Sequence, residues 1–130
     1  MGIRLPVPRP HEQTVRVERL PAVWNGGVTI SNGQNFTSGN GANVLVMQGD
    51  GNLVLLRQGV PQWNSGTFGH AGAYATMQTD GNLVVYSSTH TPLWYSNTSG
   101  NPGAATYVQD DGNVVIYAQV PHWSTNTTGS

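Results

Sequence analysis

The chain has 130 residues, a formal net charge of −1, 8% charged residues and no cysteine. This length suits one domain with a hydrophobic core of its own, and the small charge argues against a nucleic-acid surface or a basic membrane-binding patch. The absence of cysteine excludes disulfides, thiolate metal sites and a cysteine nucleophile. We also find no secretory signal and no run near the roughly 18 apolar residues that span a bilayer. We therefore expect no membrane insertion; the compartment stays open between the cytoplasm and export without a signal peptide.

The first 21 residues form an arm whose composition differs from the rest. Its first twenty residues hold four of the five arginines and three prolines: Arg4, Arg9, Arg16, Arg19, Pro6, Pro8 and Pro10. In the segment TVRVERL (14–20), polar and apolar residues alternate well enough for it to add an edge strand at a partner surface. The proline-rich beginning of the arm could equally be disordered. We predict a partly ordered arm over residues 1–21 and a single domain over residues 22–130.

Three similar segments recur along that domain: QGDGNLVLL (48–56), QTDGNLVVY (78–86) and QDDGNVVIY (109–117). Their first residues are 30 and 31 positions apart, and self-similarity at a fixed period indicates a repeated structural unit. Each segment is followed by a loop that contains proline and then by a tryptophan-led tail, WNSGT, WYSNT or WSTNT. Abundant glycine, asparagine, serine and threonine favour an all-β fold. Each unit is predicted to contain a strand, a glycine turn, a second strand, a loop and a third strand that begins at the tryptophan.

The Asp-Gly pair inside each segment predicts a β-hairpin. A two-residue loop would put Gln78 and Asn82 on opposite faces, whereas a three-residue Thr-Asp-Gly loop with a left-handed glycine sets them directly across from each other. The second register also pairs apolar residues on the buried face of every unit: Met47 with Leu53, Met77 with Leu83, and Val108 with Val114. Because strand side chains alternate between faces, the Gln, Asp, Asn, Val and Tyr of each segment would form one shallow, exposed patch.

A structural explanation accounts for part of this pattern. A single Asp-Gly-Asn sequence is most often only a turn, but turn chemistry does not explain the Gln before each loop or the Tyr that ends two of the three segments. The repeated tryptophans, Trp63, Trp94 and Trp123, fit a shared core better than a ligand surface. Trp24 lies outside the repeat series and receives no prediction.

The pattern Gln-x-Asp-x-Asn-x-Val-x-Tyr, repeated three times with a Trp-x-Ser/Thr-x-Thr tail, resembles the monocot (bulb-type) mannose-binding lectins over roughly residues 22–130. The resemblance implies a β-prism II fold, in which three antiparallel four-stranded sheets surround a pseudo-threefold axis with the tryptophans near it. It also implies one mannose site on each sheet. The implied binding residues are Gln48, Asp50, Asn52 and Val54 in the first unit, Gln78, Asp80, Asn82, Val84 and Tyr86 in the second, and Gln109, Asp111, Asn113, Val115 and Tyr117 in the third.

The resemblance also implies a role for each residue type. In the second unit the implied contacts are Gln78 with O3 of mannose, Asp80 and Asn82 with the axial O2 hydroxyl, Tyr86 with O4, and Val84 with the sugar carbons. The first unit departs from the pattern because Leu56 stands where Tyr is expected. One neutral hydrogen bond contributes about 0.5–1.5 kcal/mol, so we expect the first site to bind roughly two- to tenfold more weakly.

A second departure is the missing disulfide, because plant relatives commonly carry a cysteine where this chain has Gly51. Without this disulfide, stability depends more on the hydrophobic core and on dimerisation. The missing cysteine also leads us to expect a bacterial member of the family. Family members often dimerise by exchanging C-terminal strands. We therefore expect a homodimer, with any exchanged segment near residues 122–127.

The residue types suit a sugar on physical grounds as well. One carboxylate and two carboxamides supply acceptors and donors for neighbouring hydroxyls, the ionised Asp gives a charge-assisted hydrogen bond, and Val with an aromatic ring meets the C–H side. No metal or other cofactor is required. We predict a non-catalytic, multivalent lectin for α-D-mannose and mannose-rich glycans.

Three other functions compete with this prediction. A glycosidase needs two carboxylates that flank one bond, but Asp110 and Asp111, the only adjacent pair in a repeat, would face opposite ways; the scattered histidines support no triad. One carboxylate per loop is too few for a calcium cage. The strongest alternative is a sugar-independent structural or adhesion scaffold, or the targeting module of a bacteriocin-like protein.

Overall fold

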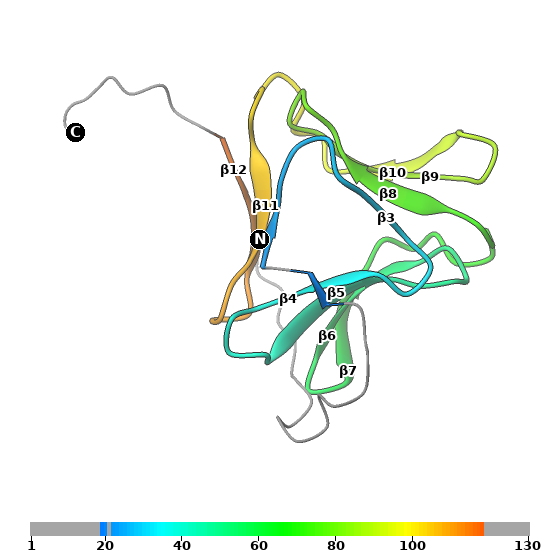
Figure 1. The fold of residues 1–130 in the computed structure, drawn as a ribbon. Helices are drawn as coiled ribbons and strands as arrows, with labels where there is room; N and C mark the ends of the chain where they lie inside the picture. Colours follow the sequence, from blue (N-terminus) through cyan, green and yellow to red (C-terminus); the bar gives the residue numbers. More distant parts are fainter. Residues whose placement is uncertain (1–18, 21, 119–130) are drawn as a thin grey trace, which may run out of the picture.

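The computed structural model describes residues 19–20 and 22–118, in which three β-sheets surround a common axis like the faces of a prism (Figure 1). The all-β, three-sheet architecture predicted above is confirmed. The first sheet contains β1 (Arg19–Leu20), β4 (Asn35–Thr37), β5 (Asn43–Met47), β6 (Leu53–Arg57) and β7 (Val60–Asn64). The second contains β3 (Thr29–Ser31), β8 (Tyr74–Met77), β9 (Leu83–Tyr86) and β10 (Pro92–Tyr95), and the third contains β2 (Val23–Trp24), β11 (Ala105–Val108) and β12 (Val114–Tyr117). No helix capable of crossing a membrane occurs in the described part of the chain.

The segment before the first repeat gives one strand to each sheet. The consecutive strands β2, β3 and β4 pair with β11 of the third sheet, β8 of the second and β5 of the first, respectively. In the first and second sheets, the added strand joins the three strands of the repeat unit; in the third sheet it joins the two strands that lie within the described residues. The periodicity could not reveal these strands, because residues 23–37 carry no copy of the repeated motif. The tryptophan-led strand predicted for the third sheet lies in residues 119–130, outside the described residues.

The first sheet has a further edge strand, β1. Arg19 and Leu20 pair in parallel with Asn35 and Phe36 of β4. The sequence suggested that TVRVERL could add an edge strand at a partner surface; its last two residues pair with the chain's own sheet. The outer strand of a sheet has backbone N–H and C=O groups with which a further extended segment can pair, and β1 takes this place beside β4.

The predicted hairpin register is confirmed in all three units. The paired residues are Met47 with Leu53, Met77 with Leu83, and Val108 with Val114. In the second unit the Gln78 N–H donates to the Asn82 carbonyl at 2.8 Å, so a three-residue loop separates the two strands. The loop glycines are left-handed, with φ of 94° at Gly51, 94° at Gly81 and 91° at Gly112.

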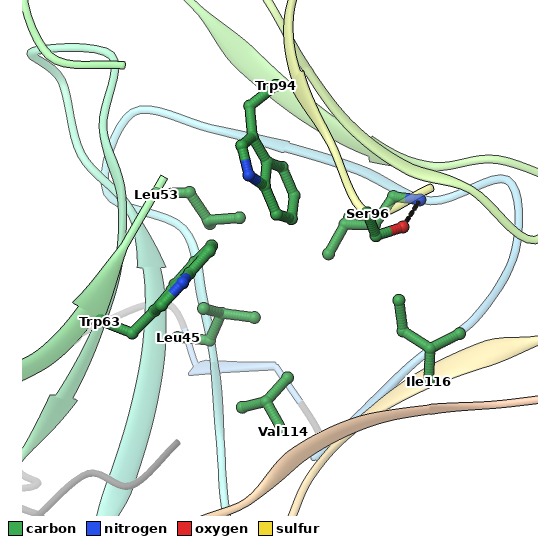
Figure 2. Close-up of a pocket in the computed structure, with 8 residues that line it drawn as sticks. Leu45, Leu53, Trp63, Trp94, Ser96, Val114 and Ile116 are labelled. Atoms are coloured by element: carbon green, nitrogen blue, oxygen red, sulfur yellow. Dashed lines mark hydrogen bonds between the residues drawn. The ribbon is translucent and has the colours of Figure 1, made fainter. Parts of the chain in front are cut away.

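The core lies between the three sheets, around the axis. Trp63 and Trp94 are half-buried, and their rings meet edge to face with centroids 5.2 Å apart. Figure 2 shows both indoles lining a small apolar cavity with Leu53 and Val114. Trp123, the third tryptophan of the series, lies outside the described residues.

Trp24, which the periodicity left without a role, is a central core residue. Its side chain is fully buried and stacks on Phe36 of β4 with centroids 4.8 Å apart. The indole Nε1–H donates to the Val28 carbonyl at 2.8 Å, so its polar group is satisfied inside the core. This residue therefore packs β2 of the third sheet against β4 of the first sheet.

Each hairpin loop accepts a hydrogen bond from a loop that belongs to another part of the chain. The tip of the first unit accepts a backbone hydrogen bond at Asp50 O from His70 at 3.1 Å, and the tip of the second accepts one at Asp80 O from Asn101 at 2.9 Å. In the third unit Asn40 N–H donates to the Asp110 carboxylate at 2.8 Å. Each hairpin is therefore braced by a loop from another part of the chain, and the last contact returns to the first sheet.

Candidate functional site

The outer face of the second sheet carries the polar row predicted from the sequence. Gln78 directly follows β8, and Asp80 lies in the exposed hairpin loop. Asn82, directly before β9, and Tyr86, at the end of β9, are both half-buried. They share this outer face, because Leu83 and Val85, which alternate with them, are buried. The structure thus brings the four polar residues of one repeat onto one exposed surface.

Asp80 has one oxygen engaged and one available. Its Oδ1 accepts the backbone N–H of Asn82 at 2.9 Å, which closes the turn. Within the described residues, Oδ2 has no hydrogen-bond partner. The same carboxylate-to-backbone contact occurs at Asp50 and Asp111, at 3.0 and 2.9 Å. The Asp therefore shapes the loop and still presents a charged acceptor to solvent in the second unit.

Asn82 is oriented by the tryptophan-led tail of its own unit. Its Oδ1 accepts hydrogen bonds from Ser96 Oγ and from the Thr98 backbone N–H, both at 3.1 Å. Thr98 Oγ1 in turn donates to the Gly81 carbonyl at 2.5 Å. With its carbonyl oxygen held, Asn82 turns its amide N–H groups away from the tail, where no described residue accepts from them.

The first unit repeats this arrangement. Asn52 Oδ1 accepts from Ser65 Oγ and from the Thr67 backbone N–H, both at 3.2 Å. We did not foresee this role for the tails, although the Ser-x-Thr pattern after Trp63 and Trp94 was the available signal. The tail does not only add a strand to the sheet; it fixes the donor direction of the site asparagine.

Gln and Tyr form a pair in two of the three units. Gln78 Nε2 donates to the Tyr86 hydroxyl, and Gln109 Nε2 donates to the Tyr117 hydroxyl at 2.8 Å. In the first unit Leu56 cannot accept this bond, and Gln48 makes no side-chain hydrogen bond with any described residue. The first site is thus the one whose Gln is not held in place.

The valines differ from the expectation of a fully exposed patch. Val54 and Val84 are only 4% and 3% exposed, while Val115 is half-buried. Val84 lies between Thr76 of β8 and Tyr95 of β10 in the sheet, so neighbours on both sides cover it. In the first two units the valine therefore lies beneath its neighbours and exposes little surface to a ligand.

The third unit has a different internal arrangement. Asp111 Oδ1 accepts the Asn113 backbone N–H, and Oδ2 accepts the Asn113 side-chain amide at 3.1 Å. Both carboxylate oxygens are engaged, and the residues of its tail lie outside the described residues. Asp110 instead accepts a hydrogen bond from the Asn40 backbone N–H. Of the two adjacent carboxylates, Asp111 therefore holds the hairpin loop and Asp110 holds the loop between β4 and β5.

The sequence and the structure are both similar to those of known mannose-specific lectins. No family model matches the sequence. Over 62 residues the chain is 45% identical to a mannose-specific lectin of Narcissus pseudonarcissus, which covers 47% of this chain and 55% of that relative. The structure is similar to the mannose-specific agglutinin of snowdrop (Galanthus nivalis) complexed with methyl α-D-mannoside, with a TM-score of 0.71, 40% identity, and coverage of 84% of this chain and 99% of that one. The chain belongs to the family of monocot mannose-specific lectins.

Other members of this lectin family support the same assignment. The Polygonatum cyrtonema lectin, complexed with monomannoside, has a TM-score of 0.71 and 32% identity, and covers 84% of this chain and 99% of that one. These matches confirm the predicted β-prism II fold. The chain spans 40–55% of the length of the curated lectins it matches.

No metal centre accompanies the lectin fold in the described part of the chain. No three His, Asp or Glu side chains gather there closely enough to hold an ion. Each site instead offers a carboxylate and carboxamides, with a tyrosine hydroxyl in two units. Such groups bind a polyhydroxylated ligand through direct hydrogen bonds.

Proposed function

We propose that the protein is a non-catalytic lectin that binds α-D-mannose and mannose-rich glycans at up to three shallow sites. The observation that carries the proposal is the organisation of the second site. Asp80, Asn82 and the Gln78–Tyr86 pair converge on one exposed surface, and internal hydrogen bonds fix each of them while leaving groups free. Its lectin relatives, among them structures complexed with mannosides, support mannose as the ligand.

The chemistry of the second site suits vicinal hydroxyls. A hydroxyl can donate to the free Asp80 oxygen and accept from the Asn82 amide at the same time, and the Gln78 carbonyl oxygen serves the next hydroxyl along. The bond to Asp80 is charge-assisted and is the strongest of the set. An epimer that moves one hydroxyl leaves these groups unpaired, which gives selectivity between hexoses.

The three sites are proposed to differ in strength. The second has the complete set of oriented groups, the third has its Asp111 oxygens engaged by Asn113, and the first lacks the tyrosine. A site of four or five modest hydrogen bonds gives a dissociation constant of about 1 mM, or about −4 kcal/mol. Tight binding then depends on several sites engaging one branched glycan.

The organisation around these sites is part of the same proposal. We propose a lectin domain over residues 22–130, preceded by the arm over 1–21 and assembled as a homodimer. The segment proposed for strand exchange, near residues 122–127, lies outside the described residues. The absence of a cysteine at position 51 supports a bacterial source.

Calorimetry tests the proposed function directly. The purified chain is titrated with methyl α-mannoside, methyl α-galactoside and a mannose-rich oligosaccharide. We expect millimolar mannoside binding, no heat with the galactoside, and oligosaccharide binding tighter by roughly a hundredfold through multivalency. No heat and no NMR shift change with any of the three ligands would overturn the proposal and favour a sugar-independent scaffold.

A further inference from the structure

An aromatic cluster continues the second site beyond the residues used above. Tyr74 of β8 lies directly across from Tyr86 of β9, and their rings stack with centroids 5.5 Å apart and an interplanar angle of 25°. Tyr74 shares the outer face with Gln78, because Ala75 and Met77, which alternate with them, are fully buried. The outer-face residues of the second site therefore continue from Tyr86 across to β8, at the end of the hairpin away from its loop.

His90 completes this cluster from the loop between β9 and β10. The Tyr74 hydroxyl lies 2.6 Å from His90 Nδ1, and the two rings meet edge to face with centroids 5.8 Å apart. His90 is exposed, and its Nε2 has no partner among the described residues. In the neutral tautomer that accepts at Nδ1, the proton resides on Nε2 and is available to a ligand.

The loop that carries His90 is held in a single shape. The Ser87 N–H donates to Thr91 O, and the His90 N–H donates to Ser87 O, both at 2.8 Å. Ser87 Oγ also accepts the backbone N–H groups of Thr89 and Thr91, at 3.2 and 3.1 Å. His90 has φ of 69°, which is uncommon for a residue other than glycine. The imidazole is thus placed before any ligand arrives, which lowers the ordering cost of binding.

Within the described residues, a stacked tyrosine pair with a histidine beside it occurs in the second unit only. The third unit has instead an edge-to-face contact between Tyr107 and Tyr117, with centroids 5.2 Å apart. The position across from the last motif residue is Val44 in the first unit, across from Leu56, and Ala105 in the third, across from Tyr117. Neither residue offers a ring or a hydroxyl. The repeated motif alone therefore does not account for Tyr74 and His90.

We propose that Tyr74 and His90 form a subsite for a second hexose that is linked to a hexose in the second site. The aromatic rings meet the C–H groups of the second sugar, and the Tyr74 hydroxyl and His90 Nε2 bond its hydroxyls. This inference rests on the proposed function and deepens it. The second unit recognises a disaccharide, whereas the first and third recognise a single sugar.

The test isolates the second site. In a chain carrying Asp50→Asn and Asp111→Asn, we measure dissociation constants for methyl α-mannoside and for its α1→2-, α1→3- and α1→6-linked dimannoside counterparts by NMR titration. At least one dimannoside should bind roughly five- to tenfold tighter than the monosaccharide, since one or two added hydrogen bonds give that range. Adding Tyr74→Phe or His90→Asn should reduce this ratio to below about twofold.

Matched variants keep the result interpretable. Tyr74→Phe retains the stacked ring, and Asn tolerates the left-handed backbone at position 90. Tyr107→Phe, which removes an outer-face hydroxyl from the third sheet, should leave the dimannoside ratio unchanged. Monosaccharide binding without any dimannoside preference, or a preference retained in either folded variant, overturns the two-residue subsite and leaves the lectin proposal standing. No binding of methyl α-mannoside to the unmodified chain overturns both.

Discussion

The first and second units share the backbone structure of the hairpin and differ in the side chains on its outer face. Their hairpins have the same register, the same left-handed glycine at φ 94°, and the same Ser and Thr contacts to the site asparagine. Their outer faces end differently, with Val44 across from Leu56 in one and Tyr74 across from Tyr86 in the other. The shared backbone structure is set by backbone contacts and by the tail, so ligand binding can change at the end of the hairpin without changing the fold.

The largest expected effect comes from disrupting the backbone structure that the two units share. A Cβ at Gly81 would lie 2.4 Å from the Asn101 carbonyl oxygen, and one at Gly51 would lie 2.4 Å from that of His70. Gly81→Ala and Gly51→Ala should each lower the free energy of unfolding by about 3–4 kcal/mol, through the left-handed backbone plus the clash. Urea denaturation measures both.

Gly33→Ala is the matched control. Gly33 has φ of +88°, but a Cβ there would meet nothing within 4 Å. We expect only the backbone term of about 1–2 kcal/mol. Equal losses in all three variants would show that the close approach of the bracing loops contributes nothing to stability.

The next effect separates the two units by function. Asp80→Asn removes a charge-assisted hydrogen bond and should weaken sugar binding at the second site roughly ten- to hundredfold. The new side-chain oxygen can still accept the Asn82 N–H, so the free energy of unfolding should change little. NMR titration with methyl α-mannoside, followed at the amides of each hairpin, measures each site separately.

Asp50→Asn and Asp110→Asn provide the comparison for that experiment. Asp50→Asn should change total binding less, because the first site is the weaker one. Asp110→Asn removes the same charge outside the sites, and its effect should be confined to the contact with Asn40. If Asp80→Asn unfolds the protein while the sugar titration of its folded fraction is unaffected, the carboxylate has only a turn-forming role.

A smaller effect is expected from releasing Asn82. Ser96 Oγ donates to Asn82 Oδ1 and accepts the Leu83 N–H at 2.9 Å. Ser96→Ala leaves that backbone donor without its partner and should cost about 1–3 kcal/mol of stability, with weaker binding at the second site. Ser65→Ala removes the corresponding contacts in the first unit. It should cost the same stability but leave the second site intact, as thermal unfolding and NMR titration together would show.

Local chemistry explains which features could be predicted from the sequence. The hairpin register follows from the Asp-Gly loop and the period-two alternation, both of which act within a few residues. The outer row of Gln78, Asp80, Asn82 and Tyr86 follows from the same alternation. The three-sheet prism required the additional observation that the unit recurs three times, together with the family resemblance.

The features that escaped prediction depend on contacts between distant segments. Asn82 is oriented by Ser96 and Thr98, which lie 14 and 16 residues away. Val84 is covered by neighbouring strands, and Trp24 enters the core only because the N-terminal segment crosses every sheet. Periodicity places a side chain on a face, but it does not say which neighbour covers or holds it.

The smallest expected effect is a gain in sugar affinity at the first site, obtained by adding the tyrosine hydroxyl that the first unit lacks. Leu56→Tyr would place a phenol on the outer face of β6, across from Val44, and give Gln48 the hydroxyl partner that Gln78 and Gln109 already have. We expect binding at the first site to become roughly two- to tenfold tighter, the contribution of one neutral hydrogen bond. NMR titration in a chain carrying Asp80→Asn and Asp111→Asn isolates that site.

Leu56→Phe separates the hydroxyl from the ring. If the hydroxyl matters because it fixes Gln48 and meets the sugar, Leu56→Phe should leave the affinity of the first site close to that of the parent chain. An equal gain from Phe and Tyr would assign the difference between the units to aromatic contact with the sugar. No gain from either would place the weakness of the first site elsewhere on its outer face, where Val44 and Leu56 replace the stacked tyrosines of the second unit.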